Sequence, residues 1–415
     1  MNGDQPFALG DGQKDIAVGD WRQEECRRKI ADRAGFRHTN PGGRATAFMN
    51  ELAELIRREI KQGGDLSYAR FMELALYHAQ WGYYERPAEV APGQQGDFYT
   101  SVSVGPLFGQ MLAFQFAADL ASLGGKCQIV EAGAHDGRLA RDILTWLDRQ
   151  RPDLRVAVEY WLLEPSPRRR QLQEVLLAEF GGRVRWFDSW SAVPSSGVRG
   201  VIFGNELLDA FPVHRLAWNA RSRVWEELGV TVAGPGDGFT WKRLAPRLAN
   251  GESHPLAPVL PEALLDVLPD GFLTEAGLAA AAWWRQAAGA LSAGQLLTLD
   301  YGLTREEFFT PERGRGTTRA YRRHQVTADL LADPGGQDLT AQVNFSAVRE
   351  AGEAAGLRTT TWVSQAQFLT AILSRILAAR ESFGDWGSAQ NRQFQTLTHP
   401  EHLGRPFRVL AQSRS

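Results

Sequence analysis

The feature that most constrains the fold is a change of rhythm in the hydrophobic pattern after Gly125. Beyond this point short apolar runs alternate with amphipathic helical patterns, in the order Lys126–Ala132, Arg138–Gln150, Val156–Leu163 and Arg168–Phe180. Short apolar strands that alternate with helices indicate βαβ units and a parallel sheet covered on both faces. The sequence therefore predicts an α/β fold with an open, Rossmann-like sheet.

The segments around this sheet predict three regions. Residues 1–45 are polar and punctuated by glycine, which predicts a flexible N-terminal arm. Residues 46–125 carry apolar side chains at three- and four-residue steps, which predicts a helical N-terminal extension. Residues 126–415 then form the sheet-containing core. Residues 213–270 contain a Pro-rich stretch and a strand-pair pattern near Val224–Val232, so we expect an insertion there after the fourth strand.

Composition narrows the classes of fold and partner. The 415 residues are 43% hydrophobic and 23% charged, which excludes collagen-like, coiled-coil and wholly disordered chains. The formal net charge of −2 gives no support to nucleic-acid binding. Cys26 and Cys127 lie far apart, and neither they nor the histidines form a metal-ligand spacing, so we expect no metal site.

The compartment is predicted from two segments. Residues 1–20 lack the basic start and apolar core of an export signal. The most apolar stretch, Phe272–Leu299, is interrupted by polar and charged residues, whereas a bilayer-spanning helix needs about 20 mainly apolar residues. We therefore expect a soluble, cytoplasmic protein that does not bind a membrane.

The turn after the first predicted strand has features of a nucleoside-binding loop. It reads EAGAHDG over Glu131–Gly137. In an open parallel sheet ligands bind beyond the carboxyl ends of the strands, and glycine lets the backbone turn sharply and approach them. Glu131, Gly133 and Gly137 match the acidic-x-G-x-G-x-G turn of nucleoside-binding methyltransferases, with His135 in place of the middle glycine. The G-x-G-x-x-G fingerprint of dinucleotide folds fits less well, and a plain strand-to-helix connection remains the alternative.

Acidic residues also follow the next two predicted strands. Glu164 stands at the tip of the second strand, where a carboxylate can accept the two ribose hydroxyls of a bound nucleoside. Asp188 follows the third strand, where it can accept the exocyclic amine of adenine. The alternatives are a solvated Glu164 and a helix N-cap at Asp188 before Trp190.

Two further carboxylates, Glu206 and Asp209, follow the fourth strand. If a helical turn starts here, the two side chains share one face beside the expected crevice. Paired carboxylates bind a guanidinium in bidentate fashion, so the pair suits a cationic substrate. The alternative is a helix N-terminus whose dipole favours acidic residues. Methyltransferases that act on amide or base nitrogens use N/D-P-P-Y here, which Leu207 and Leu208 do not match.

Six ordered blocks of sequence carry a resemblance to a known family. They are FMELALYHAQWGYY at Phe71–Tyr84, GDFYT at Gly96–Thr100 with PLFG at Pro106–Gly109, NELLDAFPVH at Asn205–His214, LDYG at Leu299–Gly302, GTTRAYRRH at Gly316–His324 and DPGGQDLTAQVNF at Asp333–Phe345. From about residue 46 to the C-terminus, the chain resembles the MidA-type class I S-adenosylmethionine (SAM)-dependent methyltransferases, which include a mitochondrial complex I assembly factor that dimethylates a protein arginine. The resemblance implies a class I methyltransferase sheet, SAM as the cofactor and a protein side chain, arginine favoured, as the methyl acceptor.

The resemblance implies that Gly96–Thr100 and the Phe71–Tyr84 helix, within the N-terminal extension, help cover the active site. The residues expected to hold the cofactor are Gly96, Asp97, Thr100, Glu131, Gly133, Gly137, Glu164, Asp188 and Asn205. Glu206 and Asp209 would orient the acceptor guanidinium, and His324 would take the proton afterwards. The chain departs from the family at His135, which could crowd the methionine carboxylate or hydrogen-bond to it, and at Gln342–Phe345, where a potential titrating pair is lost.

Two other functions stay open on the sequence alone. One is a catalytically weak SAM-binding assembly factor, which the altered loop at residues 134–136 favours. The other is an NAD-type oxidoreductase on the same sheet. The expected partner is a protein substrate, and the sequence leaves a homo-oligomer open.

Overall fold

The computed structural model describes residues 45–85, 100–234, 237–244, 256–322, 325–378, 383–401 and 403–415, all within one compact unit, Thr39–Ser415. The expected arm, residues 1–45, lies outside the described residues apart from Ala45.

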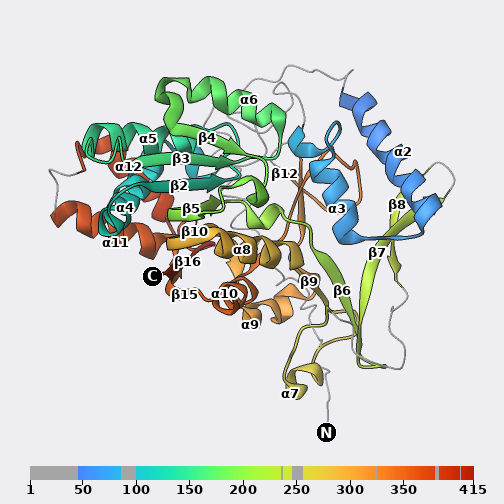
Figure 1. Ribbon diagram of the computed structural model, residues 1–415. Coiled ribbons are helices and arrows are strands. Elements are labelled where there is room, and N and C mark those ends of the chain that lie inside the picture. The colour runs from blue at the N-terminus through green and yellow to red at the C-terminus, as the bar shows by residue number, and fades with distance from the viewer. Residues whose placement is uncertain are drawn as a thin grey trace, which may run out of the picture. The chain divides into compact units, whose positions relative to one another are not determined.

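An eight-stranded sheet forms the centre of the described part of the chain (Figure 1). Its strands are β2 (Cys127–Ala132), β3 (Val158–Leu163), β4 (Val184–Phe187), β5 (Val198–Asn205), β10 (Leu291–Leu303), β14 (Val343–Asn344), β15 (Arg358–Ser364) and β16 (Phe407–Arg414). The order is β15-β16-β10-β5-β2-β3-β4, and β14 pairs with β10. The strands from β10 to β4 run parallel, and β16 is antiparallel to both of its neighbours. The open, mainly parallel sheet predicted from the hydrophobic rhythm is confirmed.

The direction of the chain reverses between two neighbouring strands of this sheet. From β2 the chain continues to β3 and β4 on one side, and then returns to β5 and β10 on the other. In open α/β sheets the ligand crevice lies at such a switch point, beyond the carboxyl ends of the strands. The loops after β2, β3 and β5 are therefore the place to look for a site.

Helices cover both faces of the central sheet. One hydrophobic cluster joins it to α4 (Leu107–Leu123), α5 (Arg138–Gln150), α11 (Gln365–Ala378) and α12 (Ser388–Thr398). A second cluster joins the other face to α8 (Leu278–Ala290) and α10 (Phe345–Ala354). A further helix, α6 (Pro167–Leu176), follows β3 and is continued by a 3₁₀ turn, η3 (Ala178–Arg183). The helix α4 packs directly on the sheet. The predicted boundary near residue 125, between the helical extension and the core, stays a prediction.

Residues 213–270, where we expect an insertion, contribute three strands to a second, five-stranded antiparallel sheet. Its strands are β1 (Leu66–Ser67), β6 (His214–Asn219), β7 (Val224–Gly234), β8 (Asp237–Arg243) and β9 (Leu273–Ala276). The helices α2 (Ala45–Gly63) and α3 (Tyr68–Tyr77) pack on it through one cluster that includes Leu52, Phe71 and Val230. The strand-pair pattern near Val224–Val232 corresponds to the single strand β7, which pairs with β1, β6 and β8. The N-terminal extension and the insertion thus share one core.

The remaining described elements connect these layers. A three-stranded sheet contains β11 (Arg319–Arg322), β12 (Gln325–Thr327) and β13 (Asp338–Thr340). Short helical segments are η1 (Tyr83–Glu85), η2 (Ser101–Val104), η4 (Trp190–Ala192), η5 (Leu208–Ala210), α7 (Glu262–Leu265), α9 (Arg305–Phe308) and η6 (Pro311–Arg313).

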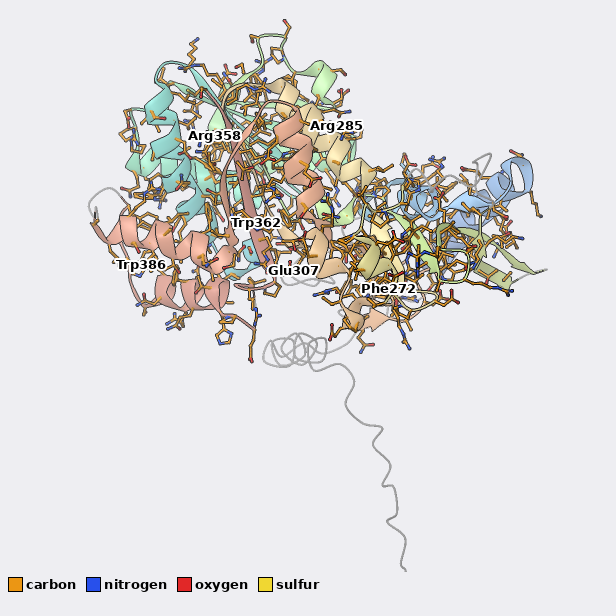
Figure 2. The ribbon with its side chains drawn as sticks, turned by 90° about the horizontal axis from the view of Figure 1, so that it is seen from below. Phe272, Arg285, Glu307, Arg358, Trp362 and Trp386 are labelled. Carbon is orange, nitrogen blue, oxygen red and sulfur yellow. The ribbon has the colours of Figure 1, made fainter. Side chains whose placement is uncertain are left out.

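Arg408 links the C-terminal strand β16 to α9 and to the neighbouring strand β15. Its Nη2 donates to Glu307 Oε1 of α9 at 3.1 Å, and its guanidinium lies 5.8 Å from the ring centre of Trp362 on β15. Figure 2 shows Glu307 and Trp362 close to one another. On β10, the residue paired in register with Arg408 is Asp300.

A buried ion pair joins the second sheet to the segment before β11. Arg215 lies 3.5 Å from Glu275 and packs against the rings of Tyr68 and Trp241. Glu275 also accepts hydrogen bonds from the backbone N–H groups and hydroxyls of Thr317 and the following threonine. Both charged side chains are almost fully buried, so each depends on its partner.

Glu275→Gln should lower the free energy of unfolding by about 3–5 kcal/mol, because Arg215 would keep a buried charge without a partner. Urea unfolding measures this loss. The matched control is Glu262→Gln, whose carboxylate is 77% exposed and pairs with Arg223; it should leave the free energy nearly unchanged. Equal effects of the two substitutions would contradict the role given to the buried pair.

Candidate functional site

The loop after β2 adopts an unusual backbone conformation. Gly133, His135 and Gly137 have positive φ values of 71°, 51° and 88°. Glycine adopts this left-handed region freely, whereas other residues rarely do. His135 therefore takes the conformation that the missing middle glycine would supply. Its side chain is 41% exposed, and Nδ1 lies 3.8 Å from Asp136 Oδ1.

Glu164 lies at the carboxyl end of β3 and is held by two donors. Its Oε1 accepts from the Ser166 N–H at 3.0 Å, and its Oε2 accepts from Gln173 Nε2 at 2.9 Å. Burial raises the pKa of this carboxyl above its ordinary value. A carboxylate can accept about four hydrogen bonds, so both oxygens keep capacity for a ligand.

Gln173 connects Glu164 to the glycine-containing loop. This side chain is fully buried on α6, and its Nε2 also donates to the His135 carbonyl at 2.9 Å. Its Oε1 accepts from Trp186 Nε1 at 3.1 Å. A role for Gln173 was not predicted from the sequence, because a glutamine within a polar helix carries no signal of burial.

Glu131 is engaged inside the fold rather than free at the end of β2. It is 3% exposed, and Tyr160 donates its hydroxyl to Glu131 Oε2 at 2.5 Å. Burial raises the pKa of Glu131 to about 8. Its predicted contact with the cofactor stays a prediction.

Asp188 follows β4 and is exposed. It accepts a hydrogen bond from the Ser189 hydroxyl at 2.8 Å. The residue at the N-cap position of η4 is Ser189, so the alternative of Asp188 as an N-cap is wrong. The predicted contact with adenine stays a prediction.

Glu206 follows β5 in a conformation that the sequence did not predict. Its φ is +51°, and the helical turn η5 begins only at Leu208, so the expected helical turn starting at Glu206 is wrong. The side chain accepts from the Ser101 N–H at 3.2 Å and from the Tyr301 hydroxyl at 3.2 Å. Burial, and next the charge of Asp209, raise the pKa of Glu206 to about 7.

Asp209 and Asp300 lie together on the other side of this turn. Asp209 is 6% exposed, and burial raises its pKa to about 7. Asp300, on β10, is fully buried, and burial and then the charge of Asp209 raise its pKa well above the ordinary value. The sequence analysis gave Asp300 no role, although an acidic residue inside the apolar run LLTLDYGL was a visible signal.

Tyrosines from the N-terminal segment line the same region. Tyr77 donates its hydroxyl to the Ala210 carbonyl, and Tyr84 donates its hydroxyl to Asp338 Oδ1, both at 2.9 Å. Arg169 of α6 donates to the Tyr84 carbonyl and lies 5.3 Å from the ring centre. These contacts bring the end of the Phe71–Tyr84 block to the carboxyl edge of the central sheet.

The site offers groups that fit a nucleoside carrying an amino acid. Asn205 Nδ2 donates to Glu206 Oε1, and Asn205 Oδ1 is buried without a hydrogen-bond partner among the described residues, so it can accept from an ammonium. A Cβ on Gly133 would lie 2.8 Å from Leu207 Cδ1, so the loops after β2 and β5 meet closely. The donor and acceptor set therefore fits SAM.

Three predicted site residues fall outside the described part of the chain, and a fourth caps a short helix. Gly96, Asp97 and His324 are not among the described residues. Thr100 is described, and its hydroxyl caps η2 by accepting from the Ser103 N–H at 3.2 Å. The predicted roles of Gly96, Asp97 and His324, and the predicted contact of Thr100 with the cofactor, stay predictions.

The sheet order and the groups at its switch point define a class I methyltransferase fold with a SAM site. Residues 111–363 match the family described as "Putative S-adenosyl-L-methionine-dependent methyltransferase", and the chain belongs to this family. A protein of Burkholderia thailandensis, solved bound to S-adenosyl-homocysteine, is 31% identical with a TM-score of 0.74. The match covers 91% of this chain and 95% of that one.

Curated relatives give a consistent result. The protein arginine methyltransferase NDUFAF7 homolog, mitochondrial, of Drosophila melanogaster is 26% identical over 389 residues, which is 87% of this chain and 84% of the relative. The protein arginine methyltransferase NDUFAF7, mitochondrial, of Mus musculus is 26% identical over 401 residues, which is 89% of this chain and 86% of the relative.

These comparisons confirm the predicted family, fold class and cofactor, and they correct one expectation. The protein is a SAM-dependent methyltransferase by family, so the NAD-type oxidoreductase is not supported. The expectation of a cytoplasmic protein is wrong as stated: the relatives are named mitochondrial, and a missing export signal does not determine a compartment. Among the described helices, none has the length and apolar character needed to cross a bilayer.

Glu131→Gln should flatten the dependence of stability on pH. A carboxyl whose pKa is about 8 in the folded protein, against an ordinary 4.5, binds its proton more tightly when folded. Its contribution to stability is therefore complete below pH 4.5 and is lost as pH rises toward 8.

Urea unfolding at a series of pH values without cofactor measures this effect. The substitution should remove up to about 1.4 kcal/mol per pH unit from the fall in unfolding free energy within that window. Gln keeps an oxygen acceptor for the Tyr160 hydroxyl. Equal slopes for the two proteins would show that Glu131 is ionised in the folded state.

Proposed function

We propose that this protein transfers the methyl group of SAM to the guanidinium of an arginine in a protein substrate. The relatives from fly and mouse carry the name protein arginine methyltransferase, which supports this acceptor. SAM supplies a methyl group bonded to a positively charged sulfur, which an acceptor nitrogen can attack. The observation that carries the acceptor chemistry is a group of carboxyls at the ends of β5 and β10.

Among the described residues, these carboxyls have no cationic partner. Within the described ranges, Glu206, Asp209 and Asp300 form no ion pair with Arg, Lys or His, although all three are buried enough to raise their pKa values. Buried charges are costly unless they are paired. An incoming guanidinium would supply the missing positive charge and five N–H donors.

The chain's own groups would position the acceptor rather than react with it. Glu206 is held by Ser101, Asn205 and Tyr301, so its carboxylate has a fixed direction. Glu206 and Asp209 would localise the positive charge of the guanidinium on two nitrogens and leave the third to attack, and positioning of this kind supplies much of a rate enhancement. His324 remains the proposed proton acceptor.

Cofactor binding is proposed for the loops after β2, β3 and β5. Glu164 would accept the ribose hydroxyls, Asn205 Oδ1 would accept from the ammonium, and Gly133 and Gly137 would let the loop backbone approach. The proposed set of cofactor-binding residues also includes Asp188, Glu131, Thr100, Gly96 and Asp97.

Methyl transfer from labelled SAM tests the activity directly. Lysate of a strain that lacks this protein supplies the unmodified acceptors, and mass spectrometry maps the modified residue. Label on an arginine supports the proposal. Label on another residue type, or no label while SAM binds, contradicts it.

Glu206→Gln should reduce turnover by about 100-fold or more and leave SAM affinity nearly unchanged, because the lost charge acts on the acceptor. Calorimetry with SAM and the methylation assay separate the two quantities. Glu174→Ala, an exposed change on α6, is the control. Loss of SAM binding together with turnover would assign Glu206 to the cofactor instead.

Glu164→Ala should weaken SAM binding by about tenfold or more, because each hydrogen bond to a charged group contributes about 1.5–3 kcal/mol. The dissociation constants for SAM and S-adenosyl-homocysteine should change together. Unchanged affinity would remove the ribose assignment. The same Glu174→Ala variant should bind both ligands as the wild type does.

A further inference from the structure

Asp300 holds the turn that carries the two proposed catalytic carboxylates. Its Oδ2 accepts from the backbone N–H groups of Leu207 at 3.1 Å and Leu208 at 2.7 Å. Its Oδ1 accepts from the N–H of Tyr301 at 2.8 Å. The side chain therefore ties the turn after β5 to the neighbouring strand β10 through two backbone donors of the turn, and the Tyr301 N–H on β10 holds its other oxygen.

This turn needs such support because its backbone is strained. Glu206 has a φ of +51°, which a residue with a Cβ rarely adopts. Strained conformations persist only where the surroundings hold them in place. Here the support is the pair of hydrogen bonds from Leu207 and Leu208 to Asp300, together with the bond from the Glu206 N–H to the Leu299 carbonyl at 2.9 Å.

Asp300 and Asp209 also influence each other's pKa values. A hydrogen bond from Asp300 lowers the pKa of Asp209, and the charge of Asp209 raises that of Asp300; two carboxyls can hydrogen-bond only when one of them carries a proton. Asp209 Oδ1 is buried and accepts no hydrogen bond from the described residues. A proton held between the Asp209 and Asp300 carboxyls would give this oxygen a partner.

We propose that Asp300 is a positioning residue that fixes the Glu206–Asp209 turn and shares one proton with Asp209. The kinetic consequence rests on the proposed methyl transfer, since it concerns the orientation of the acceptor. The shared proton is a property of the folded protein alone.

The groups around the pair make a single shared proton the stable arrangement. Glu206 from β5, Tyr77 from α3 and Tyr84 from η1 interact electrostatically with Asp209 or Asp300. Asp338 from β13 and Arg169 from α6 act on these tyrosines, and Arg408 from β16, which is in register with Asp300, is already paired with Glu307. Burial raises the pKa of Asp209 to about 7, and burial and then the charge of Asp209 raise the pKa of Asp300 well above its ordinary value, which favours a proton on the pair near neutral pH.

Asp300→Asn is the first test. An amide has one oxygen, so it can keep the donors of Leu207 and Leu208 but not also that of Tyr301. We expect turnover to fall about 10- to 100-fold with SAM affinity retained, because the acceptor is misplaced. The rising limb of the pH–rate profile should also move to higher pH, because Asp209 loses the hydrogen bond from Asp300 that lowers its pKa.

A merely structural Asp300 would behave differently. Asp300→Asn would then lower the melting temperature and the amount of active enzyme without moving the pH limb. That result, or an unchanged turnover, overturns the positioning role while leaving the proposed function intact. Absence of methyl transfer by the wild type would instead reject the proposed function.

Infrared spectroscopy tests the shared proton without any turnover. Near neutral pH the wild type should show a protonated-carboxyl C=O component that disappears in both Asp300→Asn and Asp209→Asn. Persistence of that component in either variant overturns the shared proton.

Asp119→Asn is the matched control for both experiments. Asp119 is also a carboxyl with a raised pKa, of about 6, but it accepts from Gln115 and Gln295 near the start of β10, at the opposite edge of the sheet. Its substitution should not move the rising limb of the pH–rate profile. It should also leave unchanged the protonated-carboxyl C=O component that is lost in Asp300→Asn and Asp209→Asn. A shift of the limb in this variant would show that the profile does not report on Asp209 and Asp300, and it would overturn the assignment.

Discussion

The concentration of carboxyl groups at one edge of a parallel sheet is the constraint on which the site depends. Glu206, Asp209 and Asp300 are brought together because β5 and β10 are parallel neighbours whose carboxyl ends coincide. No cation of the described chain neutralises them, so backbone donors, hydroxyls and a shared proton must do so. A stable fold that tolerates this arrangement is also one prepared to receive a positive charge.

Much of the central sheet could be predicted from the sequence, because each strand is short, apolar and followed by a helical pattern. The helix α5 has the predicted bounds, Arg138–Gln150. The second sheet could not be predicted in full. Its strands β1 and β9 find their partners across long stretches of chain, and pairing over such distances leaves no local periodicity.

The candidate site was only partly visible in the sequence. Glu164, Glu206 and Asp209 could be found because they directly follow predicted strands. Gln173 could not, because its value lies in being buried between the glycine-containing loop and Glu164. The turn at Glu206 was mistaken for a helical one because spacing alone does not reveal a left-handed backbone, which contacts with β10 maintain.

The shared core of α2, α3 and the second sheet has a consequence for how this architecture can be divided. The first helices and the stretch between β5 and β10 are a single lobe assembled from two separate pieces of chain. Trimming either piece would leave the apolar face of the other bare. A chimera that grafts new recognition specificity onto this catalytic sheet would therefore have to transplant both pieces as a set.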